Sequence, residues 1–322
     1  MGGQLDGILL DDAPQTLPLV SICVPAYQQV PYLKKLLDSV LLQDFKNFEV
    51  IITDDSPDDS VQRLVGKYLI DSRFRYFKNT PALGTPQNWN EAVCRANGKY
   101  IKIMHHDDWF TERHSLRTLV EILEQHPESD FVFCATDIRN ADTDAHVRLN
   151  QPTAQQIEMM VNLPESLILG NVLGVPSATL YRRNNDIPVY DLRIKFLVDV
   201  DYYAAVIRQN AHIQYDPRAL VGVGVSATQV TTHALKDKNL MLFEYFYFAQ
   251  KHRLNLAREP YFSFFTELLK KYRVRNVSDI KAAGFNGALD ERTLKKMIGR
   301  RHFYGWEARF RRWVMAIKSK IR

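Results

Sequence analysis

The feature that most constrains the fold is an alternation between short apolar runs and segments whose apolar residues recur three and four positions apart. The runs are typical of buried strands, and the segments are typical of amphipathic helices. Strands that alternate with helices form βαβ units around a parallel sheet, so we predict an α/β fold. The predicted strands lie at 19–24, 48–53, 75–77, 100–104 and 130–135. The predicted helices lie at 32–42, 60–70, 87–95 and 115–125.

Several of these predicted strands stop at residues that would lie together in the fold. Pro25, Asp54 and Asp107 would fall on one edge of a parallel sheet, where ligands usually bind in open α/β folds. The adjacent carboxylates Asp107 and Asp108 repel each other unless a cation compensates, which favours a metal site. The alternative is that this acid pair caps a helix over 111–126. The residues by themselves leave both interpretations open.

Composition and missing motifs exclude several classes of protein. No apolar run approaches the ~18–20 residues that span a bilayer, and the first residues lack the basic segment of a secretory signal. Cys23, Cys94 and Cys134 lie inside apolar runs, so we expect reduced core residues of a cytoplasmic protein. The turn at 25–29 contains no glycine, which argues against the G-x-G-x-x-G of a dinucleotide-binding fold.

The pattern changes along the rest of the chain. It weakens after residue 135, where we expect short helices at 164–170 and 199–210 and strands at 177–182, 212–215 and 219–225. From Lys238 onward it is helical and rich in aromatic residues. The sequence therefore predicts a loose arm at 1–17, one domain at 18–235 and a helical region with a basic end at 236–322.

Four ordered motifs carry a resemblance to a known family. VSICVPAY at 20–27, QDFKNFEVIITDDSPDD at 43–59 and the segments 84–90 and 98–108 resemble glycosyltransferase family 2. The match covers 18–135 well and 176–232 loosely. It implies the GT-A fold, in which a mostly parallel central sheet is flanked by helices. A Rossmann-like nucleotide-binding half would lie at 18–135 and an acceptor half at 136–235.

The resemblance also implies an activity, namely metal-assisted transfer of a sugar with inversion. The donor would be a nucleotide sugar, most simply a UDP-sugar. The acceptor would be a hydroxyl of a glycan or of a lipid-linked molecule, as in the synthesis of cell-surface polysaccharides. Two alternatives remain: a glycosyltransferase-like binding protein with weakened catalysis, and a sugar-nucleotide nucleotidyltransferase. The second would usually carry a glycine-rich basic loop at 25–29, which is absent here.

The resemblance assigns residues to the nucleotide site. Asp55 would accept a hydrogen bond from the imide N–H of a uracil-like base, because a carboxylate only accepts; the alternative is a solvated turn. Gly84 would let the backbone approach the ligand closely. The full predicted nucleotide-binding set is Pro25, Ala26, Tyr27, Asp54, Asp55, Gly84, Asn88, Asn90, His106 and Asp107.

The predicted metal ligands depart from the family pattern. Asp107 matches the last acid of the D-x-D motif and would bind a divalent metal that bridges the donor diphosphate. His105 stands where the first acid is expected, which favours Mn²⁺ over Mg²⁺ because imidazole tolerates Mn²⁺ better. His233 is a further candidate metal contact. Asp108 would hold the ribose or cap the following helix.

A single carboxylate is predicted to act as the catalytic base. Asp199 aligns with the family's base, and Val198 stands where a partner acid is usual. One carboxylate is sufficient to take the proton of the attacking hydroxyl. The alternative is that Asp199 only stabilises the start of a helix.

The segment from Trp306 to Arg322 combines basic residues with apolar residues at helical spacing. It fits a helix at an anionic membrane surface, which would place a cytoplasmic protein on the inner face of the membrane. Packing on the body of the protein is the alternative. No nucleic-acid motif is present, so no nucleic-acid partner is expected. The sequence leaves the sugar, the acceptor, the linkage and the oligomeric state undetermined.

Overall fold

A computed structural model describes residues 17–184, 189–225 and 234–300. His233 and the segment from Trp306 to Arg322 lie outside these ranges. The strands are β1 (Val20–Ala26), β2 (Phe48–Asp54), β3 (Phe74–Lys78), β4 (Tyr100–Ile103), β5 (Asp108–Phe110), β6 (Phe131–Asn140), β7 (His146–Asn150), β8 (Thr179–Arg182) and β9 (Ile213–Val225). In the described part of the chain they form one sheet, in the order β3-β2-β1-β4-β8-β6-β9-β5, with β7 paired to β6.

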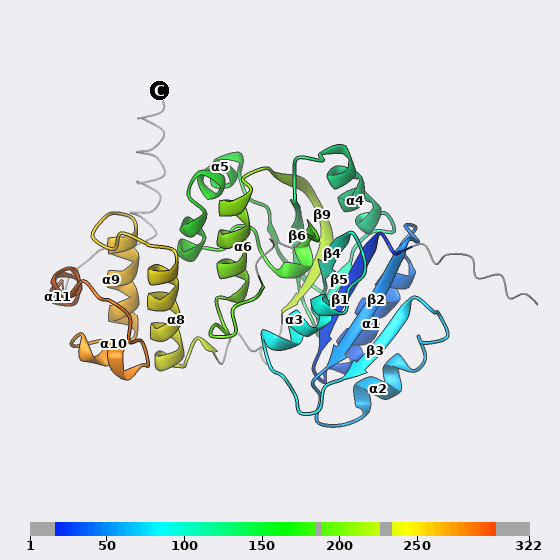
Figure 1. The fold of residues 1–322 in the computed structure, drawn as a ribbon, viewed down its shortest axis with the longest axis horizontal. Helices are drawn as coiled ribbons and strands as arrows, with labels where there is room; N and C mark the ends of the chain where they lie inside the picture. Colours follow the sequence, from blue (N-terminus) through cyan, green and yellow to red (C-terminus); the bar gives the residue numbers. More distant parts are fainter. Residues whose placement is uncertain (1–16, 185–188, 226–233, 301–322) are drawn as a thin grey trace, which may run out of the picture.

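Helices lie on both sides of this sheet, and further helices follow it between residues 234 and 300 (Figure 1). The helices of the first part are α1 (Val30–Leu41), α2 (Ser60–Val65), α3 (Gln87–Cys94), α4 (Ser115–Gln125), α5 (Ala154–Asn162) and α6 (Val198–Gln209). Two 3-10 helices are η1 (Pro164–Leu169) and η2 (Pro176–Ala178). The last four helices of the described residues are α8 (Lys238–Lys251), α9 (Tyr261–Lys271), α10 (Ser278–Ala282) and α11 (Glu291–Gly299).

The predicted parallel arrangement holds for the first four strands. β1 pairs in parallel with both β2 and β4, and β2 pairs in parallel with β3. The register sets Ala26 beside Asp54, and the Met104 N–H donates to the Cys23 carbonyl at 2.9 Å. The carboxyl ends of β1, β2 and β4 therefore meet at one edge, as the sequence predicted. Beyond β4 the sheet is mixed, because β8, β7 and β5 run antiparallel to their neighbours.

Alternate residues of the strands feed two separate apolar cores. Ile22 and Val24 face the core formed with α1, α2 and α4, whereas Cys23 faces the core that contains residues of α3, α6 and α8. Strands buried on both faces read as nearly continuous apolar runs, which is why the first strands were visible in the sequence. In Figure 1, α6 lies between the sheet and the group α8–α11.

Three expectations about local structure were wrong. The acid pair caps no helix: α4 begins at Ser115 with His114 as its N-cap, and Asp108 is the first residue of β5. The two strands expected at 212–215 and 219–225 are one strand, β9, with an irregular register opposite Cys134–Thr136. Cys94 is exposed, whereas Cys23 and Cys134 are buried.

Within the described ranges, every helix is too short or too polar to cross a lipid bilayer.

Close packing at Gly98 gives a stability prediction. A Cβ at this position would lie 2.6 Å from the Ser21 backbone nitrogen, where the chain enters β4 beside β1. We expect Gly98→Ala to lower the free energy of unfolding by about 1–3 kcal/mol, because the backbone must shift to admit the methyl group. Gly66→Ala is the matched control: its Cβ would make only an ordinary contact at 3.4 Å, and its φ of −51° suits alanine. Urea unfolding measures both; equal stability of the two variants would contradict the packing argument.

Candidate active site

The Asp55 carboxylate organises the loop that follows β3. The side chain is 5% exposed and accepts the N–H of Leu83 at 2.9 Å, the N–H of Gly84 at 2.7 Å and the Asn79 amide at 2.8 Å. Gly84 has a φ of +73°, a conformation that suits glycine. Asp55 thus fixes the backbone around Gly84, and its contact with a nucleotide base stays a prediction.

Asp54 is fully buried and held within the protein. Its carboxylate accepts the Ser56 N–H at 2.7 Å, the Tyr76 hydroxyl at 2.7 Å and the Lys78 ammonium at 3.1 Å. These bonds shape the turn after β2. The structure therefore gives Asp54 a clear role in positioning Asp55, beside the nucleotide contact that the resemblance implies.

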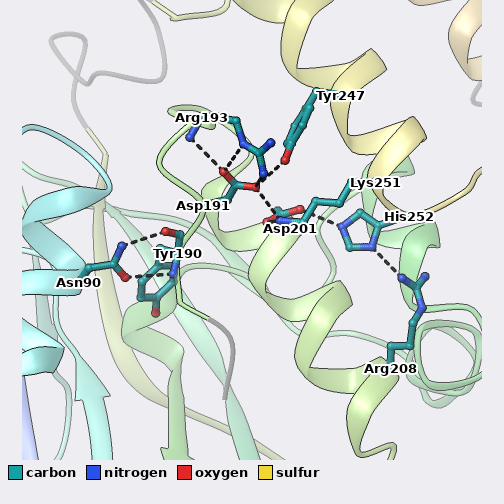
Figure 2. A network of polar contacts seen from close by, with 9 residues as sticks. All are labelled: Asn90, Tyr190, Asp191, Arg193, Asp201, Arg208, Tyr247, Lys251 and His252. Atoms are coloured by element: carbon teal, nitrogen blue, oxygen red, sulfur yellow. Dashed lines mark hydrogen bonds and ion pairs between the residues drawn. The ribbon is translucent and has the colours of Figure 1, made fainter. Parts of the chain in front are cut away.

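The two asparagines of α3 connect separate parts of the site. The Asn88 amide donates to the Thr53 carbonyl at 3.1 Å and accepts from the Asn79 amide at 2.9 Å. Asn90 donates to the Tyr190 carbonyl at 2.8 Å and accepts the Tyr190 N–H at 3.0 Å, as Figure 2 shows. Both predicted nucleotide-binding residues therefore tie α3 to its neighbours.

The end of β1 presents an aromatic side chain to solvent. Pro25 and Ala26 are buried in the strand, whereas Tyr27 is 52% exposed just beyond it. Gln28 and Gln29 follow with φ values of 53° and 50°, a left-handed conformation that is uncommon for residues other than glycine. The Gln28 N–H donates to the Ser56 hydroxyl at 2.7 Å, which holds this turn against the turn after β2.

Three residues after β4 form a cluster suited to a cation. His105, Asp107 and Asp108 each offer a ligand atom, and these atoms lie within 4.8 Å of one another. His105 Nε2 and Asp108 Oδ2 are buried, and neither has a hydrogen-bond partner within the described structure. A buried polar atom without a partner costs about 1–3 kcal/mol. The orphaned imidazole nitrogen and carboxylate oxygen therefore fit a divalent metal as their missing partner.

Burial sets the protonation of this cluster. It lowers the pKa of His105 to about 4, so that the imidazole is neutral and able to bind a metal at pH 7. Burial, reinforced by the neighbouring Asp107 charge, raises the pKa of Asp108 well above its usual range. A bound cation would offset the cost of burying the charged form of Asp108 and its repulsion by Asp107. His106, the other residue predicted here, is partly exposed.

Sequence reasoning placed Asp108 only in part and missed Ser177. The acid pair of Asp107 and Asp108 favoured a metal site, but Asp108 itself was assigned to the ribose or to a helix cap, whereas its carboxylate groups with the predicted metal ligands. The available signal was the apolar pair Trp109–Phe110. Together with Asp108 it forms the strand β5, where a helix start was the alternative. Ser177 was not singled out, and its hydroxyl accepts the His105 N–H at 2.8 Å.

Asp199 lies in the first turn of α6, as predicted. Its Oδ2 accepts the Asn171 amide at 2.8 Å, and its Oδ1 accepts the Val200 N–H at 2.8 Å. Burial raises the pKa of Asp199 to about 6. A carboxylate with a pKa close to neutral is suited to general-base chemistry. Asn171, which orients it, had no signal in the sequence.

Aromatic rings bridge the metal cluster and α6. His105 packs on Trp89 with ring centroids 4.6 Å apart, and Trp89 meets the edge of Tyr190 at 5.2 Å. Tyr190 in turn stacks on Tyr202 of α6 at 4.4 Å. The charges of Asp199 and Asp108 both add to the burial that raises the pKa of Tyr203. These contacts connect the cluster of His105, Asp107 and Asp108 with the helix that carries Asp199.

Comparison with known families and proteins gives consistent results. The family described as Glycosyl transferase family 2 matches residues 21–186. An uncharacterized glycosyltransferase of Rickettsia prowazekii is 27% identical over 227 residues, which cover 68% of each chain. An uncharacterized protein of Mycobacterium tuberculosis is 27% identical over 236 residues, or 70% of this chain and 73% of the relative.

Two solved structures resemble this fold over most of its length. S. aureus TarS residues 1–349, in complex with UDP-GlcNAc, aligns with a TM-score of 0.59 and 19% identity, covering 87% of this chain and 79% of that 1–349 chain. A mannosyltransferase from Pyrobaculum calidifontis, in complex with GDP-Man and Mn²⁺, aligns with a TM-score of 0.56 and 15% identity. It covers 94% of this chain and 84% of that one. At these identities the likeness concerns the fold.

Proposed function

Because the chain belongs to glycosyltransferase family 2 and has the GT-A fold, we propose that this nucleotide-sugar transferase uses a UDP-sugar and a divalent metal. The sugar passes with inversion to a hydroxyl of a glycan or lipid-linked acceptor. The observation that carries the proposal is the His105, Asp107 and Asp108 cluster, in which two buried ligand atoms have no other described partner. The acceptor class agrees with cell-surface polysaccharide synthesis, and the segment from Trp306 to Arg322 is the candidate membrane contact.

His105, Asp107 and Asp108 would hold the metal, and we favour Mn²⁺ because one of the three ligands is an imidazole. When bound, a divalent cation neutralises the charge that develops on a diphosphate leaving group. The similar mannosyltransferase was solved with Mn²⁺, which supports this choice of metal.

In this proposal Asp199 accepts the proton of the acceptor hydroxyl. The acceptor oxygen forms a bond to the anomeric carbon from the face opposite the phosphate, the bond to the diphosphate oxygen breaks, and the nucleoside diphosphate leaves. The Asn171 amide and the Val200 N–H orient the carboxylate for this task. Asp55 is the proposed acceptor for the imide N–H of uracil. The UDP-GlcNAc complex of TarS supports uracil as the nucleobase of the donor. The GDP-Man complex of the mannosyltransferase makes guanine the alternative nucleobase.

A thermal-shift panel tests the donor and the metal together. We expect UDP-sugars with Mn²⁺ to raise the Tm more than either component alone, because a ligand of the native state stabilises it by mass action. At a ligand concentration of 100 times Kd, the free energy of unfolding rises by about 2.7 kcal/mol. GDP- and dTDP-sugars serve as controls, each with Mn²⁺, with Mg²⁺ and with EDTA. Stabilisation only by GDP-sugars would overturn uracil as the nucleobase of the donor. Stabilisation by UDP-sugars that survives EDTA would overturn the proposed metal dependence of donor binding.

A further inference from the structure

We propose that Glu244, on α8, positions Asp199 by holding the backbone at the entrance to α6. The inference rests on the proposed role of Asp199 as base. It concerns a contact outside the residues that match the family, since the match ends at residue 186. Glu244 touches neither the donor nor the metal cluster in this proposal and acts only through α6.

The Glu244 carboxylate binds three successive backbone N–H groups. Its Oε1 accepts from Lys195 at 2.6 Å, and its Oε2 accepts from Phe196 at 2.9 Å and from Leu197 at 2.8 Å. The side chain is 0% exposed. A carboxylate buried this deeply is costly unless donors compensate it, and these backbone groups supply that compensation.

The position of these donors explains their importance for α6. Leu197 is the N-cap residue of α6 and makes no side-chain capping bond of its own. Free N–H groups at a helix start carry partial positive charge, and an anion stabilises them. Here the anion comes from another helix, 47 residues further along the chain. Glu244 therefore fixes where α6 begins, and Asp199 follows Leu197 by two residues.

A separate set of contacts docks the end of α8 onto α6, through Asp201, and onto the segment before it, through Asp191. Lys251 contacts Asp191 at 2.9 Å and Asp201 at 2.6 Å, and the His252 ring meets Asp201 at 2.8 Å (Figure 2). The Tyr247 hydroxyl also donates to Asp191, at 2.7 Å. Loss of Glu244 alone should therefore leave the two helices together and change mainly the start of α6.

The variant Glu244→Gln tests this role because its amide nitrogen would face backbone N–H groups and could not accept from them. With the nucleotide sugar selected by the thermal-shift panel, and water as acceptor, we expect kcat to fall about 10- to 100-fold, as small misplacements of a catalytic group do. The donor KM should stay within about twofold, because the donor residues lie elsewhere. Amide hydrogen exchange should become faster at 195–203 and stay unchanged at 48–54.

Glu49→Gln is the matched control. Glu49 is 7% exposed and accepts the Asn97 N–H and the Ser21 hydroxyl, each at 2.7 Å, at the amino ends of the strands. The Glu49→Gln variant should be less stable than the wild type while its kcat stays unchanged. An equal loss of kcat in Glu49→Gln would reduce the effect to general destabilisation and overturn the proposal. If Glu244→Gln does not fold, Glu244→Asp keeps the charge on a shorter side chain and should show the same kcat-specific loss to a smaller extent.

The outcome for Asp199→Asn separates the two levels of inference. If Asp199→Asn retains transfer, Asp199 is not the catalytic base, and the proposed role of Glu244 fails as well. If Asp199→Asn is inactive while Glu244→Gln keeps full kcat or changes only KM, the positioning role alone is overturned.

Discussion

Replacement of Asp107 by asparagine is expected to abolish sugar transfer while the fold stays intact. The amide keeps the size of the side chain and removes the negative charge that faces the proposed cation beside His105 and Asp108. Metal stabilisation of a leaving group is worth several kcal/mol, and each 1.36 kcal/mol is a factor of ten in rate. We therefore expect a loss of about 10³-fold or more. Product formation and the Mn²⁺-dependent Tm gain with the UDP-sugar both measure it.

Glu128→Gln is the control for this variant. Glu128 is an exposed acid beyond the far end of α4, where its carboxylate contacts only the His126 ring at 3.1 Å among the ion pairs of the described chain. It should leave turnover and metal-dependent stabilisation unchanged. Turnover like that of the wild type in Asp107→Asn would refute the metal role.

The second large effect is expected at Asp199. Asp199→Asn should keep Mn²⁺-dependent donor binding and lose transfer by about 10²- to 10⁴-fold, the usual contribution of a general base. Because burial raises the pKa of Asp199 to about 6, the carboxylate is charged above that pH and protonated below it. Only the charged form can accept a proton. The wild-type rate should therefore be level above about pH 6 and fall about tenfold per unit at lower pH.

Asp290→Asn is the matched comparison, because Asp290 is also an acid at a helix start and caps α11 through the Thr293 N–H. It should retain both turnover and the acid limb of the pH profile. Undiminished transfer by Asp199→Asn, or a pH profile without a fall near 6, would remove Asp199 as the base. An inactive wild-type protein that still binds the donor would instead support the weakened binding protein.

Much of the fold at residues 18–135 could be predicted because its signals are local. The strands β1, β2 and β4 are buried on both faces, so apolar residues predominate in each one. Asp55 and Asp107 could be assigned to the same edge of the sheet because parallel strands end there. The position of Asp199 in the first turn of α6 followed from helical spacing alone.

The role of Asp108 depends on a distant pairing that no local pattern reveals. Asp108, Trp109 and Phe110 pair with β9, more than 100 residues away in the chain. The Trp109 ring lies over Gly222, where a Cβ would come within 2.4 Å of the ring. A bulky residue at Gly222 would exclude this arrangement. The sequence shows both glycine and tryptophan but not that they meet, so a helix cap stayed open as an alternative to a metal site for the acid pair.

The same limit applies to β9 and to Glu244. Two strands were expected at 212–215 and 219–225, whereas the structure has one strand that passes residues 216–218 with an irregular register beside β6. Glu244 lies within an aromatic helix and resembles an ordinary surface residue when read by spacing. Its three backbone partners at 195–197 come from another part of the chain, so only the structure reveals them.

The exposure of Cys94 has a practical consequence. Burial raises the pKa of the Cys134 thiol to about 11 and that of Cys23 further, so neither forms the reactive thiolate at neutral pH. Cys94 ends α3, whose first turn carries Asn88 and Asn90. A maleimide fluorophore would therefore attach at one place without any engineered mutation. A change in its emission on addition of a nucleotide sugar would then report occupancy of the proposed nucleotide site in real time, before the natural acceptor is identified.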